Sequence, residues 1–321
     1  MPPNTLRASR FGTDSRLGRP CTPTRRGPVE TACSRLRLDY TVDLHYELFG
    51  DADFVFSVHA AHTDQQRVLH EALVVAPAAG WRVDTEPVFG NRLLRLRAPA
   101  GPLDVKYEAS VAVAHYLREP RDVIAGVLGD LPVEVLPFLR PSRYCQADEV
   151  QQLAWREFGA LAPGHDQVDA VCRWVRSRVE FRVGTSTIAT SALDTLEHGV
   201  GVCRDFVHAT IALLRGLNYP ARFVTGVDYG APVALGPPDF HSYVEAWIAG
   251  RWWIFDPTGI TPLTGLIRIG TGRDAADVAF ATMFGNVRGG MPKVAFAAVD
   301  DPAAGISLPQ ATTLAVSTAT L

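Results

Sequence analysis

The fold class that the sequence predicts is an antiparallel, β-sandwich-like domain followed by a second domain in which helices precede strands. Alternating apolar and polar residues in the first half have the two-residue period of half-buried strands. Apolar residues at helical spacing dominate the next stretch, and a proline-rich passage at residues 131–144 separates the two patterns. At 321 residues the chain is long enough for two ordinary domains with cores of their own.

Residues 1–34 precede this pattern and contain mainly arginine, proline, serine and threonine. Such a segment cannot bury enough apolar surface to offset the entropy of ordering it. We therefore expect a disordered N-terminal tail or an over-extended translation start, rather than a targeting or binding arm. We expect no function from this segment.

The β-rich N-terminal domain is expected at residues 35–135. Its clearest strand begins at Arg35, where apolar residues from Leu36 to Leu44 alternate with charged and polar ones. Further strand-like runs lie at residues 54–58, 67–75, 92–97 and 103–113. Short strands at this spacing predict an antiparallel sandwich. Three histidines of this region lack metal-ligand spacing, so a structural or substrate-flanking role is favoured for them; they are His59, His62 and His70.

The second domain is expected at residues 136–300, after a connector whose prolines exclude a helix or a central strand. Asp148 has the residue type of an N-cap for a first helix, and a second helix is expected at about residues 166–179. Cys172 falls in the apolar stripe of the second helix, where a free cysteine is usually just a small hydrophobic residue. Cys145 has no activating neighbour. We therefore expect both cysteines to be structural.

Helices and then strands are expected over the rest of the chain. Ser191 and Gly199 have the residue types that begin and end a short helix at residues 192–198. A longer helix is expected to start at about Cys203 and to stop at Asn218 and Pro220. Strands are expected at residues 221–227, 241–248, 252–256 and 294–299, with loop composition at 270–274 and a flexible C-terminal tail at 301–321.

Composition excludes several classes of function. The formal net charge of −3 leaves no general positive field to attract nucleic acid or a membrane surface, so a peptide, protein or small-molecule substrate is expected. The five cysteines are widely spaced and without a C-x-x-C pair, which argues against a disulfide framework and indicates a reducing compartment. No apolar run approaches the roughly 18 residues of a membrane span, and the N-terminus lacks the apolar segment of a signal peptide. We therefore expect a cytoplasmic protein.

Cys203 is the candidate nucleophile. A thiolate is stabilised at a helix N-terminus, where unpaired N–H groups and the helix dipole favour negative charge, and by a nearby imidazolium. Gly199 and Gly201 allow a tight approach to the helix that would leave the sulfur facing a cleft, and the Cys203 N–H could donate to an oxyanion. The alternative is a buried cysteine that only begins a core helix.

His241 and Asp256 are the candidate partners of this thiol, on two successive expected strands joined at residues 249–251. A loop with an even number of residues puts the two side chains on one face as opposite or diagonal neighbours, whereas an odd loop without a bulge separates them. A paired carboxylate would fix the imidazole tautomer and leave the other ring nitrogen to exchange a proton with the thiol. The alternatives are a surface histidine at a strand end and an ordinary turn aspartate.

Zinc is the competing chemistry, because this region has four potential ligands: His198, Cys203, His208 and His241. If the helix starts at Cys203, His208 lies about 140° around the helix axis from it, so the two side chains cannot share a ligand face. The sequence contains no EF-hand loop, P-loop or dinucleotide-binding glycine pattern. We therefore expect no metal and no cofactor.

Four runs of this sequence resemble the core of bacterial transglutaminase-like proteins, a superfamily often described as cysteine proteases. They are Gly-Val-Cys-Arg-Asp-Phe-Val-His at 201–208, Pro-Ala-Arg-Phe-Val-Thr-Gly at 220–226, Asp-Phe-His-Ser-Tyr-Val-Glu-Ala at 239–246 and Arg-Trp-Trp-Ile-Phe-Asp-Pro-Thr at 251–258. Residues 141–144 and 272–279 are similar to flanking motifs of the family, and the β-rich half resembles its N-terminal domain. The resemblance therefore covers about residues 35–300. Ser242 and Tyr243 depart from the aromatic pair expected after the histidine, which affects substrate detail.

This resemblance implies a papain-like α+β core with Cys203 as nucleophile, His241 as general base and acid, and Asp256 as its orienting partner. It implies thiol-dependent acyl transfer on peptide or carboxamide bonds through a thioester. Hydrolysis by a cysteine peptidase or amidase is favoured, with a protein-glutamine transglutaminase as the alternative. A non-catalytic peptide-binding module on the same fold is the second alternative, and it predicts an unreactive Cys203.

Three further polar residues near these motifs have less definite roles. Asp205 fits the family pattern, but an acid in the first helical turn is favourable for the helix dipole, so a structural role is expected. Arg273 and Asp274 either line the cleft or form a salt bridge within their own loop.

Overall fold

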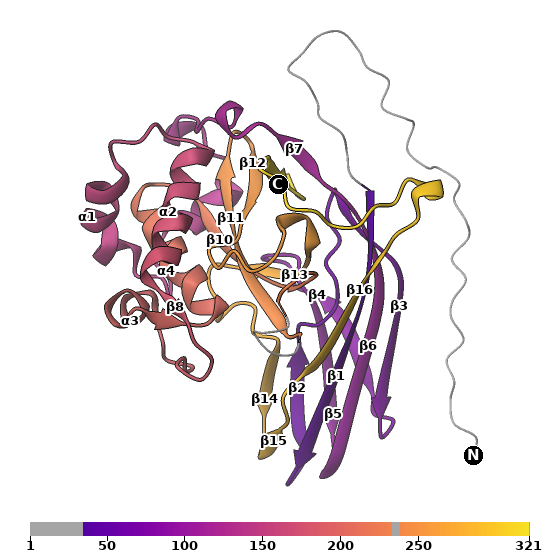
Figure 1. Ribbon diagram of the computed structural model, residues 1–321. Coiled ribbons are helices and arrows are strands. Elements are labelled where there is room, and N and C mark those ends of the chain that lie inside the picture. Colours follow the sequence, from indigo (N-terminus) through magenta and orange to yellow (C-terminus); the bar gives the residue numbers. More distant parts are fainter. Residues whose placement is uncertain (1–34, 233–237, 321) are drawn as a thin grey trace. The chain divides into compact units, whose positions relative to one another are not determined.

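The computed structural model describes residues 35–232 and 238–320 (Figure 1). The expected N-terminal tail at residues 1–34 lies outside these ranges, together with Cys21 and Cys33. A β-rich part is followed by a part of helices and strands, so the predicted α+β fold class is confirmed. No helix in the described ranges is long and apolar enough to cross a membrane.

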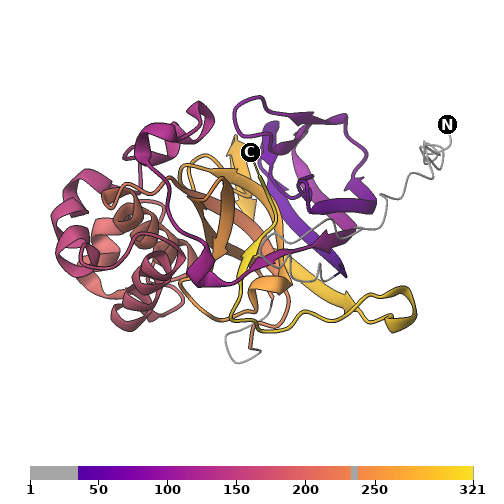
Figure 2. The same cartoon turned by 90° about the horizontal axis from the view of Figure 1, so that it is seen from above.

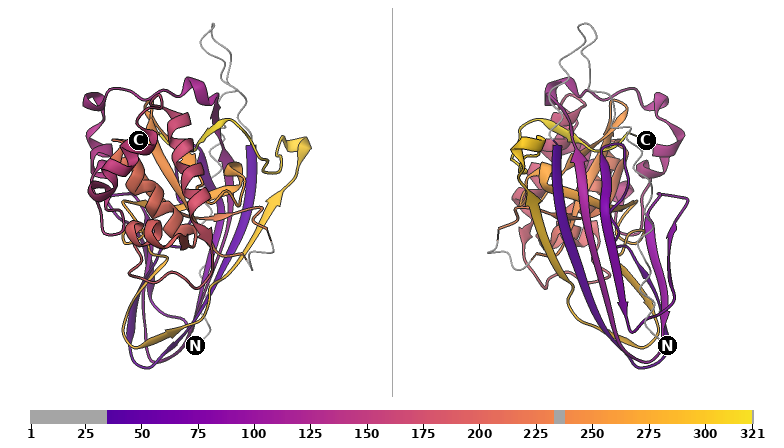
Figure 3. Two further views of the ribbon diagram at one scale, coloured as in Figure 1. Left: turned by 60° about the vertical axis from the view of Figure 1, so that its left-hand side comes forward. Right: turned by 90° about the vertical axis from the view of Figure 1, so that its right-hand side faces the viewer.

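The largest sheet is built around one long strand at the start of the described chain. Its members are β1 (Arg35–Leu48), β3 (Gln66–Ala76), β6 (Gly101–Ala114), β15 (Val287–Gly289) and β16 (Lys293–Val299). The order is β15-β1-β6-β3, and β16 pairs with the same edge of β1 as β15 (Figure 3). Every second side chain of β1, from Leu36 to Leu48, is buried, which follows directly from the alternation in the sequence.

A second antiparallel sheet completes the β-rich part. Its members are β2 (Ala52–Phe56), β4 (Trp81–Thr85), β5 (Arg92–Ala98) and β14 (Ala281–Phe284), in the order β14-β2-β5-β4. Apolar side chains of β1 and β6 share one buried core with those of β2 and β5. Within it the Tyr46 ring lies 5.4 Å from that of Phe54 and 5.7 Å from that of Phe56. Two sheets packed over a common core form the sandwich that the sequence predicts.

The sandwich is discontinuous in sequence, which differs from the expected boundaries. Strands β14, β15 and β16 lie at residues 281–299, yet they pair with β2 and β1. The second domain expected at residues 136–300 therefore wrongly includes residues 281–299, which belong to the sandwich. Its alternating pattern predicts a strand at Val294, but the pairing partner is far away in the sequence and is not encoded locally.

Within the described residues, the second part contains four α-helices and a four-stranded sheet. The helices are α1 (Ala147–Phe158), α2 (His165–Arg178), α3 (Ala192–His198) and α4 (Cys203–Gly216). The sheet has the order β12-β11-β10-β13, with β10 (Ala221–Asp228), β11 (Phe240–Ile248), β12 (Arg251–Phe255) and β13 (Leu266–Gly272). The helices lie on one side of this sheet (Figure 2). Helix α4 is buried from Asp205 to Gly216 because it packs against the other helices and the sheet.

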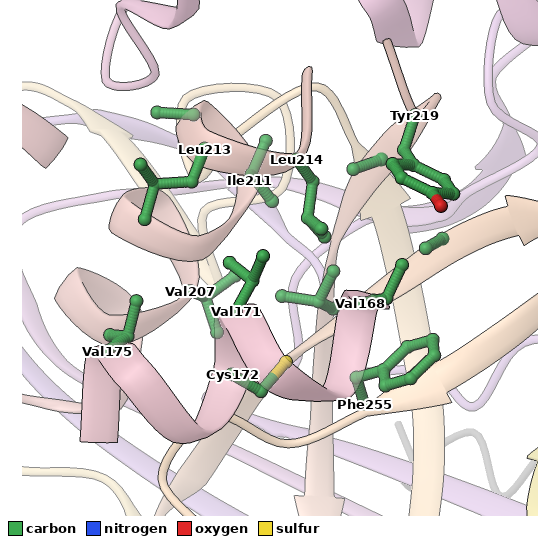
Figure 4. Close-up of a cluster of buried hydrophobic side chains, with 14 of the residues drawn as sticks. Val168, Val171, Cys172, Val175, Val207, Ile211, Leu213, Leu214, Tyr219 and Phe255 are labelled. Carbon is green, nitrogen blue, oxygen red and sulfur yellow. The ribbon is translucent and has the colours of Figure 1, made fainter. Parts of the chain in front are cut away.

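Helices α2 and α4 meet through complementary apolar stripes (Figure 4). Val171 and Val175 of α2 are fully buried, as are Val207 and Ile211 of α4. Cys172 lies in the same cluster, 2% exposed, so its prediction as a core residue is confirmed. The predicted start of α1 is wrong by two positions, because Gln146 and not Asp148 is the N-cap residue. The connector contains only short 3-10 helices, such as Val133–Leu139.

The C-terminal segment differs from the flexible tail expected at residues 301–321. Strand β17 (Ala315–Ser317) pairs with β7 (Tyr116–Arg118), and Ala319 forms a bridge with Trp252. A segment rich in Ala, Ser and Thr is typical of a frayed chain end, but small side chains also pack closely against a large neighbour such as Trp252. Val316 of this segment is 0% exposed. The expected loop at residues 270–274 is also partly wrong, because β13 continues to Gly272.

Candidate active site

Cys203 is the first residue of α4, as the sequence predicts. Helix α3 ends at Gly199 in a left-handed conformation, with φ 68°, which favours glycine. The short parallel pair β8 (Glu180–Phe181) and β9 (Val200–Gly201) then fixes the approach, and Val202 is extended immediately before the helix. Cys203 remains partly exposed at this point. The backbone therefore presents the thiol at a helix N-terminus, where negative charge is favoured.

Asp205 closes the first turn of α4. Its carboxylate is fully buried and accepts the Val202 N–H at 2.8 Å and the Ser186 hydroxyl at 2.8 Å. A Cβ at Gly201 would lie 2.7 Å from the Asp205 Cβ, so only glycine fits beside it. These contacts support the structural role expected for Asp205.

The β11–β12 hairpin brings His241 and Asp256 together. Ile248 pairs with Arg251 across the loop, which therefore consists of Ala249 and Gly250, with φ values of 52° and 79°. Such positive values at both loop positions are typical of a tight hairpin turn. Because the loop is even, Asp256 lies diagonally across from His241, and its Oδ2 is 3.3 Å from the imidazole Nε2. This confirms the prediction that an even loop places the side chains of His241 and Asp256 on one face of the hairpin.

Asp256 is held from a second direction by its own turn. Its Oδ1 accepts the Thr258 N–H at 2.9 Å and the Thr258 hydroxyl at 2.7 Å. Asp256 is buried, with 5% of its surface exposed, and both of its carboxylate oxygens have hydrogen-bond partners within the protein. Asp256 is at once a turn residue and the partner of His241, so the two interpretations of it do not exclude each other.

The charges of the couple stabilise each other. Burial alone would lower the pKa of His241, but the Asp256 carboxylate and the Cys203 thiol beside the ring raise it well above its usual range. Burial would likewise raise the pKa of Asp256, but His241 and the Thr258 hydrogen bonds hold it below its usual range. The raised pKa of the ring favours an imidazolium, and the lowered pKa of Asp256 favours an ionised carboxylate beside it. A neighbouring imidazolium is the group that favours a thiolate.

A loop from the end of β8 to α3 borders the N-terminus of α4. The Arg204 guanidinium donates to the Thr187 carbonyl oxygen at 2.5 Å and to the Ser186 hydroxyl. The Tyr144 hydroxyl donates to the Ile188 carbonyl oxygen at 2.6 Å, and the Ile188 side chain is 81% exposed. The loop is tied to the residue next to Cys203 but keeps an apolar side chain at the surface.

Asp228 is a residue of the site that sequence reasoning missed. It is the last residue of β10, and its Oδ2 lies 3.9 Å from the His241 Nδ1. The expected strand ended one residue earlier, at Val227. The connection from β10 to β11 is long, so no parity rule links Asp228 to His241 in the sequence.

The remaining candidates lie elsewhere or are buried. His208 is fully buried, accepts the Ala275 N–H at its Nε2 and stacks on Tyr144, so it does not face Cys203. Among the described residues no group of three or more His, Cys, Asp or Glu side chains is placed to hold a metal. Burial raises the pKa of the Cys145 thiol to about 12.

Arg273 and Asp274 form contacts within their own loop and with the connector. Arg273 makes an exposed ion pair with Asp277 at 2.9 Å. The buried Asp274 accepts the Tyr144 N–H at 3.0 Å. Arg273 therefore forms a salt bridge within its own loop and does not line a cleft.

Comparisons with known proteins match both parts of the chain. A transglutaminase-like superfamily model matches residues 153–257, and a bacterial transglutaminase N-terminal domain model matches residues 36–128. The crystal structure of a "Putative Cysteine Protease" from Cytophaga hutchinsonii is 36% identical, with a TM-score of 0.82, over 88% of this chain and 98% of that chain.

Curated mycobacterial relatives are uncharacterised proteins. ML0607 of Mycobacterium leprae is 38% identical over 127 residues, which cover 37% of this chain and 45% of that protein. Rv2569c of Mycobacterium tuberculosis is 27% identical over 165 residues, covering 48% of this chain and 52% of that protein. The chain spans about half the length of these curated relatives. The two family models and the near-complete match to the Cytophaga protein establish that the chain belongs to the bacterial transglutaminase-like superfamily.

Proposed function

We propose that the protein is a thiol-dependent acyl-transfer enzyme in which Cys203, His241 and Asp256 act as a catalytic triad on a peptide or carboxamide bond. The observation that carries the proposal is the 3.3 Å contact between Asp256 Oδ2 and His241 Nε2, on a ring whose pKa is also raised by Cys203. This contact commits Nε2 to the carboxylate and leaves Nδ1 for proton exchange with the thiol.

In the first half-reaction the Cys203 thiolate attacks the carbonyl carbon of the substrate. The resulting oxyanion takes a hydrogen bond from the Cys203 N–H, since the first N–H groups of a helix have no partner within it. The His241 imidazolium gives its Nδ1 proton to the leaving amine. The C–N bond breaks, a thioester to Cys203 forms, and Asp256 keeps the ring oriented throughout.

In the second half-reaction a nucleophile resolves the thioester. His241, now neutral, takes a proton from water, the hydroxide adds to the carbonyl carbon, and the C–S bond breaks to release the acid and the thiolate. A primary amine that takes the place of water would give an amide, which is the transglutaminase outcome. We favour hydrolysis, as a cysteine peptidase or amidase, because water needs no dedicated binding site.

The proposal is tested with p-nitrophenyl acetate, which requires no knowledge of the natural substrate. We expect a burst of p-nitrophenolate close to one equivalent per chain, and an acetyl group on the Cys203 peptide by mass spectrometry. The matched control is Cys203→Ser, which keeps the side-chain shape and should give no burst. A wild-type progress curve identical to that of Cys203→Ser contradicts the proposal and favours a non-catalytic binding module.

The two fates of the thioester are separated by adding butylamine to the same reaction. Hydrolysis predicts acetate as the main product at every amine concentration tested. Accumulation of N-butylacetamide at millimolar amine, with a matching loss of acetate, would assign the protein to the transferases instead.

A further inference from the structure

The imidazole of His241 lies between two carboxylates that come from opposite sides of its strand. Strand β11 is flanked by β12, which leads into Asp256, and by β10, which ends at Asp228. Gly226 of β10 pairs directly with His241, so Asp228, two residues on, is its diagonal neighbour. The separations are 3.3 Å from Nε2 to Asp256 Oδ2 and 3.9 Å from Nδ1 to Asp228 Oδ2.

Gly226, which pairs with His241, is a position of β10 where only glycine fits. A Cβ at this residue would lie 2.2 Å from the Ile267 carbonyl oxygen and 3.2 Å from the Tyr243 ring. A larger residue would therefore move β10 relative to its neighbours.

Asp228 is in an unfavourable place for an isolated carboxylate. Its side chain is 7% exposed. Burial raises the pKa of Asp228, the carboxylates of Asp256 and Asp239 act in the same direction, and His241 opposes them. Burying a carboxylate costs stability even when a cation lies beside it, so the presence of Asp228 here points to a role other than stabilisation.

We propose that Asp228 is a positioning residue for His241, a second carboxylate that holds the protonated ring opposite Asp256 and sets the pH range in which the ring and the Cys203 thiol form an ion pair. The inference rests on the proposed function of Cys203 and His241. Asp228 forms no covalent bond in the reaction and acts only through the imidazole.

The charges around the ring predict the direction of this effect. The groups that act on His241 are Asp256 after β12, Asp228 on β10 and Cys203 on α4, while Asp239 lies just before β11 and acts on Asp228. Removing the negative charge of Asp228 makes the thiolate easier to form, because one like charge is lost. It also makes the imidazolium easier to deprotonate, because one opposite charge is lost.

The test is the rate of Cys203 alkylation by iodoacetamide as a function of pH, measured on the full chain. In the wild type we expect two steps, one for formation of the ion pair and one for loss of the imidazolium proton. In Asp228→Asn both steps should move to lower pH, by about 0.5–1 unit. Asp228→Glu, which restores the charge, should bring both steps back towards the wild-type pH.

The control is Asp104→Asn, which removes a carboxylate that is 61% exposed and pairs with His45, and it should leave both steps in place. A merely structural role of Asp228 would change the rates without moving the steps. Wild-type steps in Asp228→Asn therefore overturn the inference while leaving the proposed function intact. A single wild-type step near pH 8.5 that is also present in His241→Ala would instead overturn the proposed function itself.

Folding of the variants supplies a second readout. Because burial raises the pKa of Asp228, its ionised form destabilises the folded state at neutral pH, so Asp228→Asn should melt at or above the wild-type temperature. A variant that instead melts lower, with unmoved alkylation steps, identifies Asp228 as a structural residue and contradicts the inference.

Discussion

Arg176 of α2 holds the backbone of Asp256. Its Nη2 donates to the Asp256 carbonyl oxygen at 2.9 Å, and its Nε donates to the Pro257 carbonyl oxygen at 3.1 Å. Gly259 leaves room for it, since a Cβ there would lie 2.2 Å from the guanidinium carbon. Helix α2 and the hairpin together therefore fix the position of the carboxylate.

This contact predicts that Arg176→Met lowers kcat for p-nitrophenyl acetate by roughly 10–100-fold, because a misplaced Asp256 turns the imidazole away from the thiol. KM should change little, since Arg176 contacts the turn and not the thiol. Arg173→Met is the matched control, because Arg173 is on the same helix but makes only an exposed ion pair with Asp169. Equal kcat values for the two variants would show that the turn keeps its geometry without Arg176.

Asp256→Asn should keep the fold and lose most of the activity. An amide can still accept from Thr258, but it cannot balance the charge of the imidazolium and it favours the wrong tautomer. The expected fall in kcat/KM is roughly 10³–10⁴-fold. Thr258→Val, which removes the hydroxyl that bonds to Asp256 but no charge, should lose far less. A fall below tenfold in Asp256→Asn would mean that His241 does not depend on this carboxylate.

His59 predicts a pH dependence of stability that is separate from catalysis. Its ring packs 4.4 Å from that of Tyr107, and burial together with Arg92 lowers its pKa to about 4. Below pH 6.5 the unfolded chain therefore binds a proton that the folded chain does not, so stability falls between pH 6.5 and about 4, by up to about 3 kcal/mol.

His59→Phe keeps the ring contact and should flatten this fall, which is measured by urea unfolding at pH 7, 6, 5 and 4. His45→Phe is the control, because His45 is exposed, and it should keep the wild-type profile. If His59→Phe loses stability on acidification as steeply as the wild type, other groups account for the dependence.

Val316 tests whether the C-terminal segment is part of the core. Its side chain is 0% exposed, so Val316→Ala should lower the free energy of unfolding by roughly 1.5–3 kcal/mol. Val183→Ala makes the same chemical change at a side chain that is 74% exposed, and it should change stability by less than about 0.5 kcal/mol. Equal stabilities of the two variants would indicate that residues 315–317 contribute little to folding.

The sequence predicted the site where its geometry is local. Cys203 starts a helix because residues within a few positions set the cap, and His241 and Asp256 meet because a two-residue loop fixes the register of their hairpin. Asp228 escaped prediction because the long connection between β10 and β11 carries no register information.

Long-range pairing limited the prediction of the fold in the same way. The pattern at β16 predicts a strand but cannot say that it pairs with β1, and it therefore misplaces a domain boundary. The burial of Val316 depends on its pairing with β7 and on its packing against Val224 and Tyr243, to which local composition gives no clue.

The central claim is that His241 activates Cys203, and the most direct test is the rate of Cys203 alkylation by iodoacetamide at pH 7 in the wild type and in His241→Ala. The comparison uses one cysteine in two proteins, so the burial of Cys145 and Cys172 does not enter. The thiolate is the form that reacts, and a neighbouring imidazolium favours it, so we expect the variant to react about tenfold or more slowly. Equal rates in the two proteins would contradict the account.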